Sequence, residues 1–510
     1  MIHSIQAPTE LTALRDRLQE IADLQGIVQL LKWDQATMMP SAGAPTRAER
    51  SATLDRALHE KLVAPALGRL LDVLEPWAAG EDPDSDGARM VWWARRDHEK
   101  AARVPADLSA DLSRAAALGQ AAWLDARDHA DFGRFSGALE RHLELRHRYV
   151  GCFEGVEHPY DVLLDDFEPG MRTSEVVPLL AELRAGLAPL VSATARDHRP
   201  RNDGVFDGPF ALQAQRAAIE TLLAGVGFDP GAWRLDPAPH PFASGVGRGD
   251  TRITLRYDEN DFGMALYSAL HEFGHGLYAA GTDPGLDRTT LDRPVSLGVH
   301  ESQSRLWENL VGRSRPFCEW LLPRLRATLG DGIGALDPDG LFRAVNAVSR
   351  SPIRVEADET TYNLHIVMRL ELELALLDGS LAVADLPAAW NARMAGDLGV
   401  EVADDGVGVL QDTHWGIGAI GYFATYTLGN LMAAQLWPRI RTDLPDLDES
   451  IVAGEFVGLR EWLGEHIHRH GRKFASRELL ARVTGEELSP EPFLRYLRAK
   501  LVESGQLQGT

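Results

Sequence analysis

Two histidines four residues apart are the clearest chemical feature of the sequence. His271 and His275 enclose Glu272 in the run HEFGH, which lies inside a helical pattern. Because residues four apart share one helix face, both imidazoles can reach a single metal ion. Glu272, one position beyond His271, can lie beside that metal and act as a general base. The alternative interpretation is two ordinary histidines on a surface or core helix.

A third metal ligand should follow this pair, because catalytic zinc usually takes three protein ligands and one water. The run HESQ supplies His300 and Glu301, at the start of a further helical stretch. We predict Glu301 as the ligand and keep His300 as its rival. Glu301 shares a helix side with Arg305 and Glu308, which could orient it or a ligand histidine.

The elements that must position these side chains are mainly helical. Apolar residues at steps of three and four begin with Leu11 and Leu14 and continue to Ile27. Hardly any segment alternates with period two, so we predict a mainly α fold. The same helical spacing recurs over residues 105–150, 173–193, 211–225, 262–280, 297–329, 361–378, 418–435 and 456–470.

One strand is predicted just before the histidine helix, at Arg252–Tyr257, where apolar and polar residues alternate. The breaker-rich stretch 235–250 before it is predicted to be a surface loop. A strand, a metal helix and a later glutamate form an arrangement in which an edge strand can hold extended peptide beside zinc. The implied chemistry is peptide hydrolysis, with a metal-polarised carbonyl and Glu272 moving the proton of the metal-activated water.

Size and composition indicate an ordinary folded protein. The chain has 510 residues, of which 45% are hydrophobic and 25% are charged, and it contains no fixed-period repeat or long low-complexity linker. We therefore predict one domain over residues 1–510, with two helical lobes around a deep cleft as the alternative arrangement.

Charge and cysteine content narrow the classes of partner. The formal net charge is −23, which repels phosphate backbones and anionic lipid alike, so we expect neither nucleic acid nor membrane as a partner. Cys152 and Cys318 are too few for a disulfide framework or a thiolate zinc site. With no cationic start leading into an apolar run, the sequence favours a cytoplasmic protein.

Five runs in the sequence resemble the carboxypeptidase Taq family of thermostable metallocarboxypeptidases. The resemblance implies a helical, gluzincin-type metallopeptidase fold with a small sheet beside a deep groove, and a homodimer. It also implies removal of single C-terminal residues from peptides with a free C-terminus, with broad specificity. It assigns the metal, Zn²⁺ or Co²⁺, to His271, His275 and Glu301, and catalysis to Glu272. The five runs are DTRIT (250–254), HEFGH (271–275), HESQ (300–303), IRVEAD (353–358) and GVLQDTHW (408–415).

Substrate-binding candidates lie in and near these runs. Arg354 offers a planar fork of donors to a terminal carboxylate, although a structural salt bridge to Glu356 or Asp358 is the ordinary alternative. Arg252 is a candidate in the groove, with an exposed strand arginine as its alternative.

Three further substrate-binding candidates lie at the end of the last run and shortly after it. His414 precedes Tyr422 and Tyr426, which share a helix face and could donate to an oxyanion or to substrate. Core packing with a satisfied hydroxyl is the alternative for these tyrosines.

Two other functions remain open at this point. An oligopeptidase or dipeptidyl carboxypeptidase could use the same metal site and place the substrate terminus differently. A non-catalytic helical scaffold with an incidental metal is the third hypothesis. Neither alternative is separated from a carboxypeptidase by the sequence pattern alone.

Overall fold

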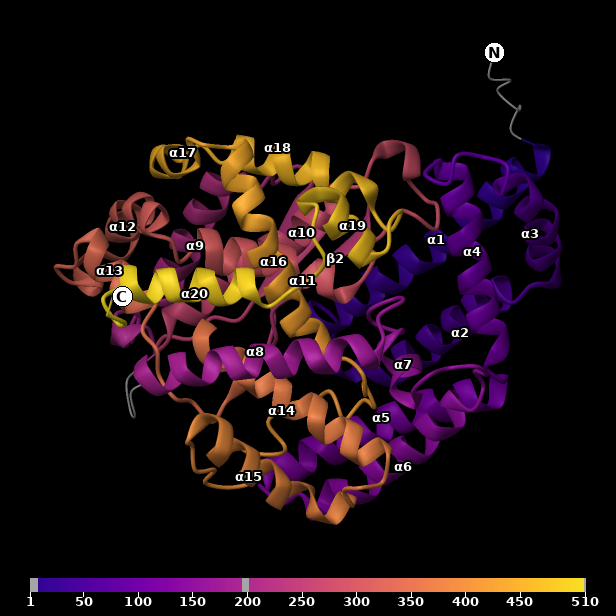
Figure 1. Ribbon diagram of the computed structural model, residues 1–510, viewed down its shortest axis with the longest axis horizontal. Helices are drawn as coiled ribbons and strands as arrows, with labels where there is room; N and C mark the ends of the chain where they lie inside the picture. The colour runs from indigo at the N-terminus through magenta and orange to yellow at the C-terminus, as the bar shows by residue number, and fades with distance from the viewer. Residues whose placement is uncertain (1–7, 195–200, 509–510) are drawn as a thin grey trace.

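Helices built on three- and four-residue apolar spacing make up most of the chain, as predicted. The computed structural model describes residues 8–194 and 201–508. Figure 1 shows α1 to α4 at one end of the molecule, α12 and α13 at the other, and α10, α11 and α16 between them. The α-helices are α1 (Thr9–Thr37), α2 (Ala44–Leu62), α3 (Pro65–Ala78), α4 (Asp86–Arg103), α5 (Ala106–Asp128), α6 (Gly133–Val150), α7 (Pro159–Leu164), α8 (Thr173–Thr194), α9 (Leu212–Val226), α10 (Phe262–Ala280), α11 (Leu297–Arg305), α12 (Arg315–Leu329), α13 (Pro338–Val345), α14 (Glu359–Leu377), α15 (Leu386–Leu398), α16 (Ala424–Asp443), α17 (Leu447–Ala453), α18 (Val457–His466), α19 (Ser476–Thr484) and α20 (Glu491–Glu503).

A small three-stranded sheet lies beside α10. It consists of β1 (Trp233–Pro237), β2 (Phe242–Gly247) and β3 (Asp250–Leu255), in the order β1-β3-β2. β1 runs parallel to β3, with Leu235 opposite Ile253, whereas β2 runs antiparallel to it. The sheet therefore presents β1 and β2 as its edges.

The predicted strand exists, but its bounds and its neighbours differ from the prediction. β3 begins at Asp250, two residues before the predicted start, and ends at Leu255. The stretch 235–250, predicted to be a loop, contains the end of β1 and all of β2. β2 was not predicted because Gly245 and Gly247 have low strand preference. Its extended conformation depends on hydrogen bonds to β3.

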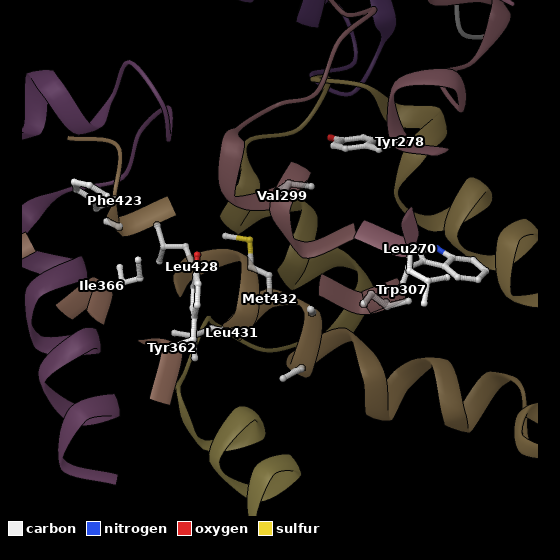
Figure 2. Close-up of a cluster of buried hydrophobic side chains, with 14 of the residues drawn as sticks. Leu270, Tyr278, Val299, Trp307, Tyr362, Ile366, Phe423, Leu428, Leu431 and Met432 are labelled. Carbon is white, nitrogen blue, oxygen red and sulfur yellow. The ribbon is translucent and has the colours of Figure 1, made fainter. Parts of the chain in front are cut away.

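The histidine helix follows the sheet and is buried on most of its surface. α10 begins after Asp261, whose side chain accepts a hydrogen bond from the backbone amide of Met264 (3.0 Å). Its apolar residues join a continuous core that extends from Leu11 to Leu501. Figure 2 shows part of this core, with Leu270 of α10 beside Trp307 on one side and Leu428, Leu431 and Met432 of α16 on the other. Whether this core divides into two lobes stays a prediction.

One described helix, α8, is long and apolar enough to cross a membrane by length and composition alone. The core helix of a folded protein passes the same test. In α8 the side chains of Leu180, Leu183 and Leu187 are buried in the common core. Arg184 in the same helix pairs with the carboxylate of Glu371 at 3.2 Å, so one face of α8 packs against the rest of the fold.

A glycine inside the HEFGH run lets α11 approach α10 closely. A Cβ atom at Gly274 would lie 2.4 Å from the carbonyl oxygen of Gln303, a distance that no side chain tolerates without a backbone shift. The spacing between the two helices is therefore set at this residue.

We predict that Gly274→Ala destabilises the metal-free protein by about 1–3 kcal/mol, because the added methyl group must push α11 away. Gly137→Ala is the control, since Gly137 lies in α6 with open space around it. Urea unfolding followed by circular dichroism, with chelator present, measures both variants. Equal midpoints for Gly274→Ala and Gly137→Ala would contradict the close approach.

Candidate active site

Two imidazoles and one carboxylate converge at the centre of the molecule. The Nε2 atoms of His271 and His275 on α10 lie 3.6 Å and 3.5 Å from Oε2 of Glu301 on α11. One ligand atom from each residue lies within 4.8 Å of the other two. Two imidazoles and a carboxylate are a donor set suited to Zn²⁺, with room for a water ligand.

Close helix packing brings Glu301 to the histidines. α11 packs against both α10 and α16, and a glycine stands at each contact. Gly274 admits the backbone of α11 on one side. On the other, a Cβ atom at Gly429 of α16 would lie 2.6 Å from Cβ of Glu301. Gly274 thus leaves room for the backbone of α11, and Gly429 leaves room for the side chain of Glu301; a larger residue at either position would prevent this packing.

Hydrogen bonds on the far side of each imidazole orient the two rings. Nδ1 of His271 lies 2.8 Å from Oε2 of Glu308, and Nδ1 of His275 lies 3.0 Å from the carbonyl oxygen of His300. In this arrangement each Nδ1–H donates, which leaves each Nε2 with a lone pair facing Glu301. The two rings are therefore prepared to bind a cation.

Arg305 balances the negative charge of the two glutamates. Its Nε donates to Oε1 of Glu301 (2.6 Å), and its NH1 donates to Oε2 of Glu308 (3.2 Å). Burial favours the neutral acids, but Arg305 and the nearby histidines outweigh it and hold the pKa of Glu301 well below its usual range. Against the same effect of burial, Arg305, His271 and Arg313 lower the pKa of Glu308 to about 2. Both carboxylates are ionised, as ligand and orienting roles require.

The rival ligand, His300, stands outside the donor set. Its ring stacks on that of His275, with centroids 4.1 Å apart and planes 17° apart. It lines a separate hollow together with Phe167 and Arg293. The geometry therefore includes the side chain of Glu301 among the donors and uses only the backbone carbonyl of His300.

Glu272 lies next to the donor set in a dry environment. Its side chain is buried, and its Oε2 has no hydrogen-bond partner among the described residues. Burial raises the pKa of Glu272 to about 7, and the carboxylates of Glu301 and Glu308 add to this effect. A carboxylate with a pKa near neutrality is suited to accept and return a proton.

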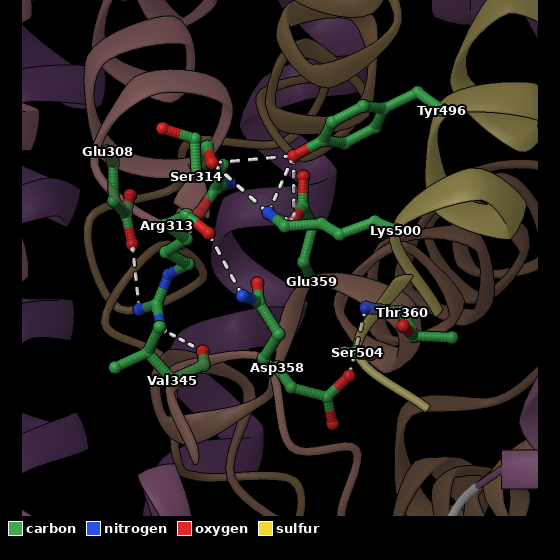
Figure 3. A network of polar contacts seen from close by, with 12 residues as sticks. Glu308, Arg313, Ser314, Val345, Asp358, Glu359, Thr360, Tyr496, Lys500 and Ser504 are labelled. Atoms are coloured by element: carbon green, nitrogen blue, oxygen red, sulfur yellow. Dashed lines mark hydrogen bonds and ion pairs between the residues drawn. The ribbon is translucent and has the colours of Figure 1, made fainter. Parts of the chain in front are cut away.

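A buried polar network links the orienting glutamate to the C-terminal helix. Glu308 lies in the π-helical turn η4 (Leu306–Val311), where Oε1 is 3.7 Å from NH2 of Arg313. Lys500 of α20 donates to the carbonyl oxygen of Asn309 in that turn (3.1 Å) and to Oε2 of Glu359 (2.9 Å). Figure 3 shows these contacts between distant parts of the chain. Sequence spacing offered no signal for Arg313, Glu359 or Lys500, because they meet only in the folded molecule.

A cavity of about 400 Å³ opens beside the donor set. His271, Glu272 and Glu301 line it, so a molecule in the cavity can reach both the metal position and the candidate base. Of the predicted substrate-binding residues, the cavity contains Arg354, His414 and Tyr426. Its other polar or charged lining residues are Arg127, His240, Arg256, Ser268, Arg305, Glu308, Asn309, Arg313, Asp358, Glu359, Gln411, Asp412, Thr413 and Asn430, together with Tyr267 and Tyr362.

Arg354 is a buried cation held by groups other than the two predicted alternatives. It lies in the 3₁₀ turn η6 (Arg354–Glu356), and its Nε and NH2 donate to Oδ1 of Asp412 at 2.9 Å and 2.7 Å. Its NH1 donates to the hydroxyl of Tyr362 (2.9 Å), and its guanidinium lies 4.8 Å from the ring centre of Tyr426. Asp412 belongs to the GVLQDTHW run, but its pairing with Arg354 was not predicted.

His414 and the two tyrosines form one cluster at the cavity wall. Nε2 of His414 lies 3.1 Å from the hydroxyl of Tyr426, and its ring centre is 4.9 Å from that of Tyr422. Burial lowers the pKa of His414 to about 4, so the ring is neutral near pH 7. Burial raises the pKa of Tyr422 to about 12, so its hydroxyl keeps its proton. Tyr426 lines the cavity itself, whereas Tyr422 packs behind it against Phe167.

Arg252 lies apart from the cavity lining. Its Nε and NH2 donate to the two carboxylate oxygens of Asp250, both at 2.8 Å. Its guanidinium stacks over Trp33 of α1, 4.2 Å from the ring centre. This pairing joins the sheet to α1, and a contact of Arg252 with substrate stays a prediction.

Comparison with known proteins finds relatives that match nearly the whole chain. A family model described as carboxypeptidase Taq (M32) metallopeptidase matches residues 13–501. Thermostable carboxypeptidase 1 from Thermus thermophilus is 42% identical, over 94% of this chain and 96% of that protein. Carboxypeptidase 1 from Bacillus subtilis is 35% identical, over 95% and 96% of the two chains. The crystal structure of the M32 carboxypeptidase from Deinococcus radiodurans R1 is similar with a TM-score of 0.92 and 40% identity, covering 98% of this chain and 100% of that one.

These matches extend over nearly the full length of each protein, and they agree with the helical fold described above. The chain belongs to the carboxypeptidase Taq (M32) metallopeptidase family.

Proposed function

We propose that this metallocarboxypeptidase removes single C-terminal residues from peptides, with broad specificity and with Zn²⁺ as its metal ion, Co²⁺ being the alternative. The observation that carries the proposal is the shared cavity: the donor set of His271, His275 and Glu301 opens onto the same space as the buried cation of Arg354. A peptide whose terminal carboxylate meets Arg354 would present its last peptide bond to the metal position.

Each residue has a role that follows from its position. A bound zinc ion would polarise the scissile carbonyl and lower the pKa of its water. Glu272 then accepts the proton of the attacking water and delivers it to the leaving amine. The hydroxyl of Tyr426, held by His414, is the candidate donor to the developing oxyanion, with Tyr422 packed behind it.

An oligopeptidase or dipeptidyl carboxypeptidase remains the alternative. Its cavity would have to accept more of the chain beyond the scissile bond. Arg354 favours the exopeptidase, because a guanidinium in the cavity wall can bind the free carboxylate at the end of a peptide. Timed digestion of a short peptide separates the two: single amino acids released in order support the carboxypeptidase, and dipeptides or internal fragments support the alternative.

We further propose a cytoplasmic homodimer acting on free-acid peptides. Support for the location is that Cys152 and Cys318 are both free thiols. Support for the dimer is the family resemblance. Light scattering on the purified protein measures the second point directly.

We predict that Glu272→Gln retains the metal and loses turnover by about 10²–10⁴-fold or more, because an amide cannot accept the proton. Glu301→Ala should instead lose metal and activity together, because it removes a ligand. Metal content by mass spectrometry and peptide turnover are measured on the same samples. Stoichiometric metal in Glu301→Ala, or near wild-type turnover in Glu272→Gln, would refute the assigned roles.

Glu308 should strengthen metal binding indirectly, by orienting His271, without binding the ion itself. We expect Glu308→Gln to weaken metal binding by about 10–100-fold, because the amide holds the Nδ1–H of His271 less strongly. Competition with a chromogenic chelator measures the dissociation constant. Glu319→Gln, an exposed position in α12, is the matched control and should leave it unchanged. An unaltered affinity in Glu308→Gln would remove Glu308 from the site.

We predict that Arg354→Ala binds metal normally but cleaves free-acid peptides at least about thirtyfold more slowly, because it loses a charge-assisted contact worth roughly 2–5 kcal/mol. It should also lose its discrimination against the same peptides with amidated C-termini. Arg343→Ala, exposed in α13, is the control. A variant with full preference for the acid would show that Arg354 is not the carboxylate-binding residue and would favour the oligopeptidase.

A further inference from the structure

We propose that Arg369 is a positioning residue for substrate selection: by neutralising Asp412, it leaves the charge of Arg354 available to the terminal carboxylate of the peptide. The proposal rests on the carboxylate-binding role of Arg354 proposed above. It concerns a residue outside the cavity lining, one helix turn beyond His365 on α14.

Arg369 is fully buried and its position is strongly constrained. Its Nε lies 2.8 Å and its NH2 lies 2.6 Å from Oδ2 of Asp412. Its NH1 donates to the carbonyl oxygen of His365 (2.7 Å), and its guanidinium lies 4.4 Å from the ring centre of Trp390. The side chain has 0% exposure, so it cannot contact a peptide itself. Any effect on substrate must pass through Asp412.

Asp412 divides its two oxygens between two arginines. Oδ2 faces Arg369, and Oδ1 accepts both bonds from Arg354. Because Oδ1 alone receives Arg354, the pair lacks the two parallel bonds that a carboxylate and a guanidinium form when they pair only with each other. Oδ2 of Asp412 therefore forms no hydrogen bond with Arg354.

The charges of Arg354, Arg369 and Asp412, which together we call the arginine cluster, do not cancel. Two guanidinium groups and one carboxylate leave a net charge of +1. Burial lowers the pKa of His414 to about 4 and that of His365 well below its usual value, so both rings are neutral near pH 7. The next two carboxylates on α14 have other partners: Glu371 pairs with Arg184 and Arg393. Glu373 accepts hydrogen bonds from Tyr160 (2.7 Å) and Trp415 (2.9 Å). Among the described residues, neither carboxylate forms an ion pair with Arg354 or Arg369.

Of the two arginines in the cluster, only Arg354 lines the cavity, so a bound anion would meet the net positive charge there. A guanidinium has five N–H groups, and Arg354 uses three of them on Asp412 and Tyr362. One N–H on each terminal nitrogen remains without a partner among the described residues, which matches the two oxygens of a carboxylate. In a buried site, a cluster of charge +1 attracts an anion far more strongly than a neutral ion pair would.

The experiment varies the cluster charge while Arg354 stays in place. Arg369→Gln gives a charge of 0, Asp412→Asn gives +2, and the double variant restores +1 with neither partner present. Each variant is loaded with zinc, and kcat/KM is measured for one peptide as the free acid and as its C-terminal amide. The readout is the ratio of these two values, which a general loss of stability does not change.

We expect Arg369→Gln to lower the acid-to-amide ratio about tenfold or more, mainly through KM, since a shift of that size corresponds to about 1.4 kcal/mol. Asp412→Asn should keep or raise the ratio. The double variant should recover to within about threefold of wild type, and Arg369→Lys should retain most of it because the charge is kept.

A wild-type ratio in Arg369→Gln, or no recovery in the folded double variant, overturns the proposal. If Arg369→Gln alone does not fold, the double variant and Arg369→Lys decide the question by the same criteria. Arg354→Ala separates this result from the proposed function. If Arg354→Ala keeps the preference for the free acid, the proposed carboxylate binding by Arg354 is wrong. If Arg354→Ala loses this preference and Arg369→Gln keeps it, only the role of Arg369 is refuted.

Discussion

The packing of α11 between α10 and α16 is the constraint on which the site depends. A metal centre needs three donors within a few ångströms, and two of them come from consecutive turns of one helix. The third comes from a neighbouring helix that must approach almost to backbone contact. Gly274 and Gly429 permit this approach on the two sides of Glu301, which therefore lies about equally far from His271 and His275.

Buried charge is the second theme of the structure, and it is distributed between two arginines with opposite tasks. Arg305 pairs with Glu301 and Glu308 and keeps both carboxylates ionised. Arg354 shares its only carboxylate with Arg369 and retains unused donors. One guanidinium thus pairs with two carboxylates beside the histidines, and the other shares one carboxylate with a second arginine.

Sequence patterns predicted the elements whose order is local and missed those whose order is not. The helical fold and the strand before α10 were predicted correctly, because apolar spacing and alternation are properties of neighbouring residues. β2 was not predicted, since a strand containing Gly245 and Gly247 is ordered only by its hydrogen bonds to β3. The pairing of Arg354 with Asp412 was not predicted either, because Asp412 lies 58 positions further along the chain.

The sequence by itself determined the chemical inventory: two imidazoles on one helix face, an adjacent carboxylate, and a later glutamate with Arg305 and Glu308 beside it. Residue spacing within a helix carries this information, because helix geometry is regular. Only the tertiary structure decided that Glu301 and not the ring of His300 joins the donors, and that Arg252 pairs with Asp250 and Trp33 away from the cavity. These choices depend on how distant helices pack, which no local pattern records.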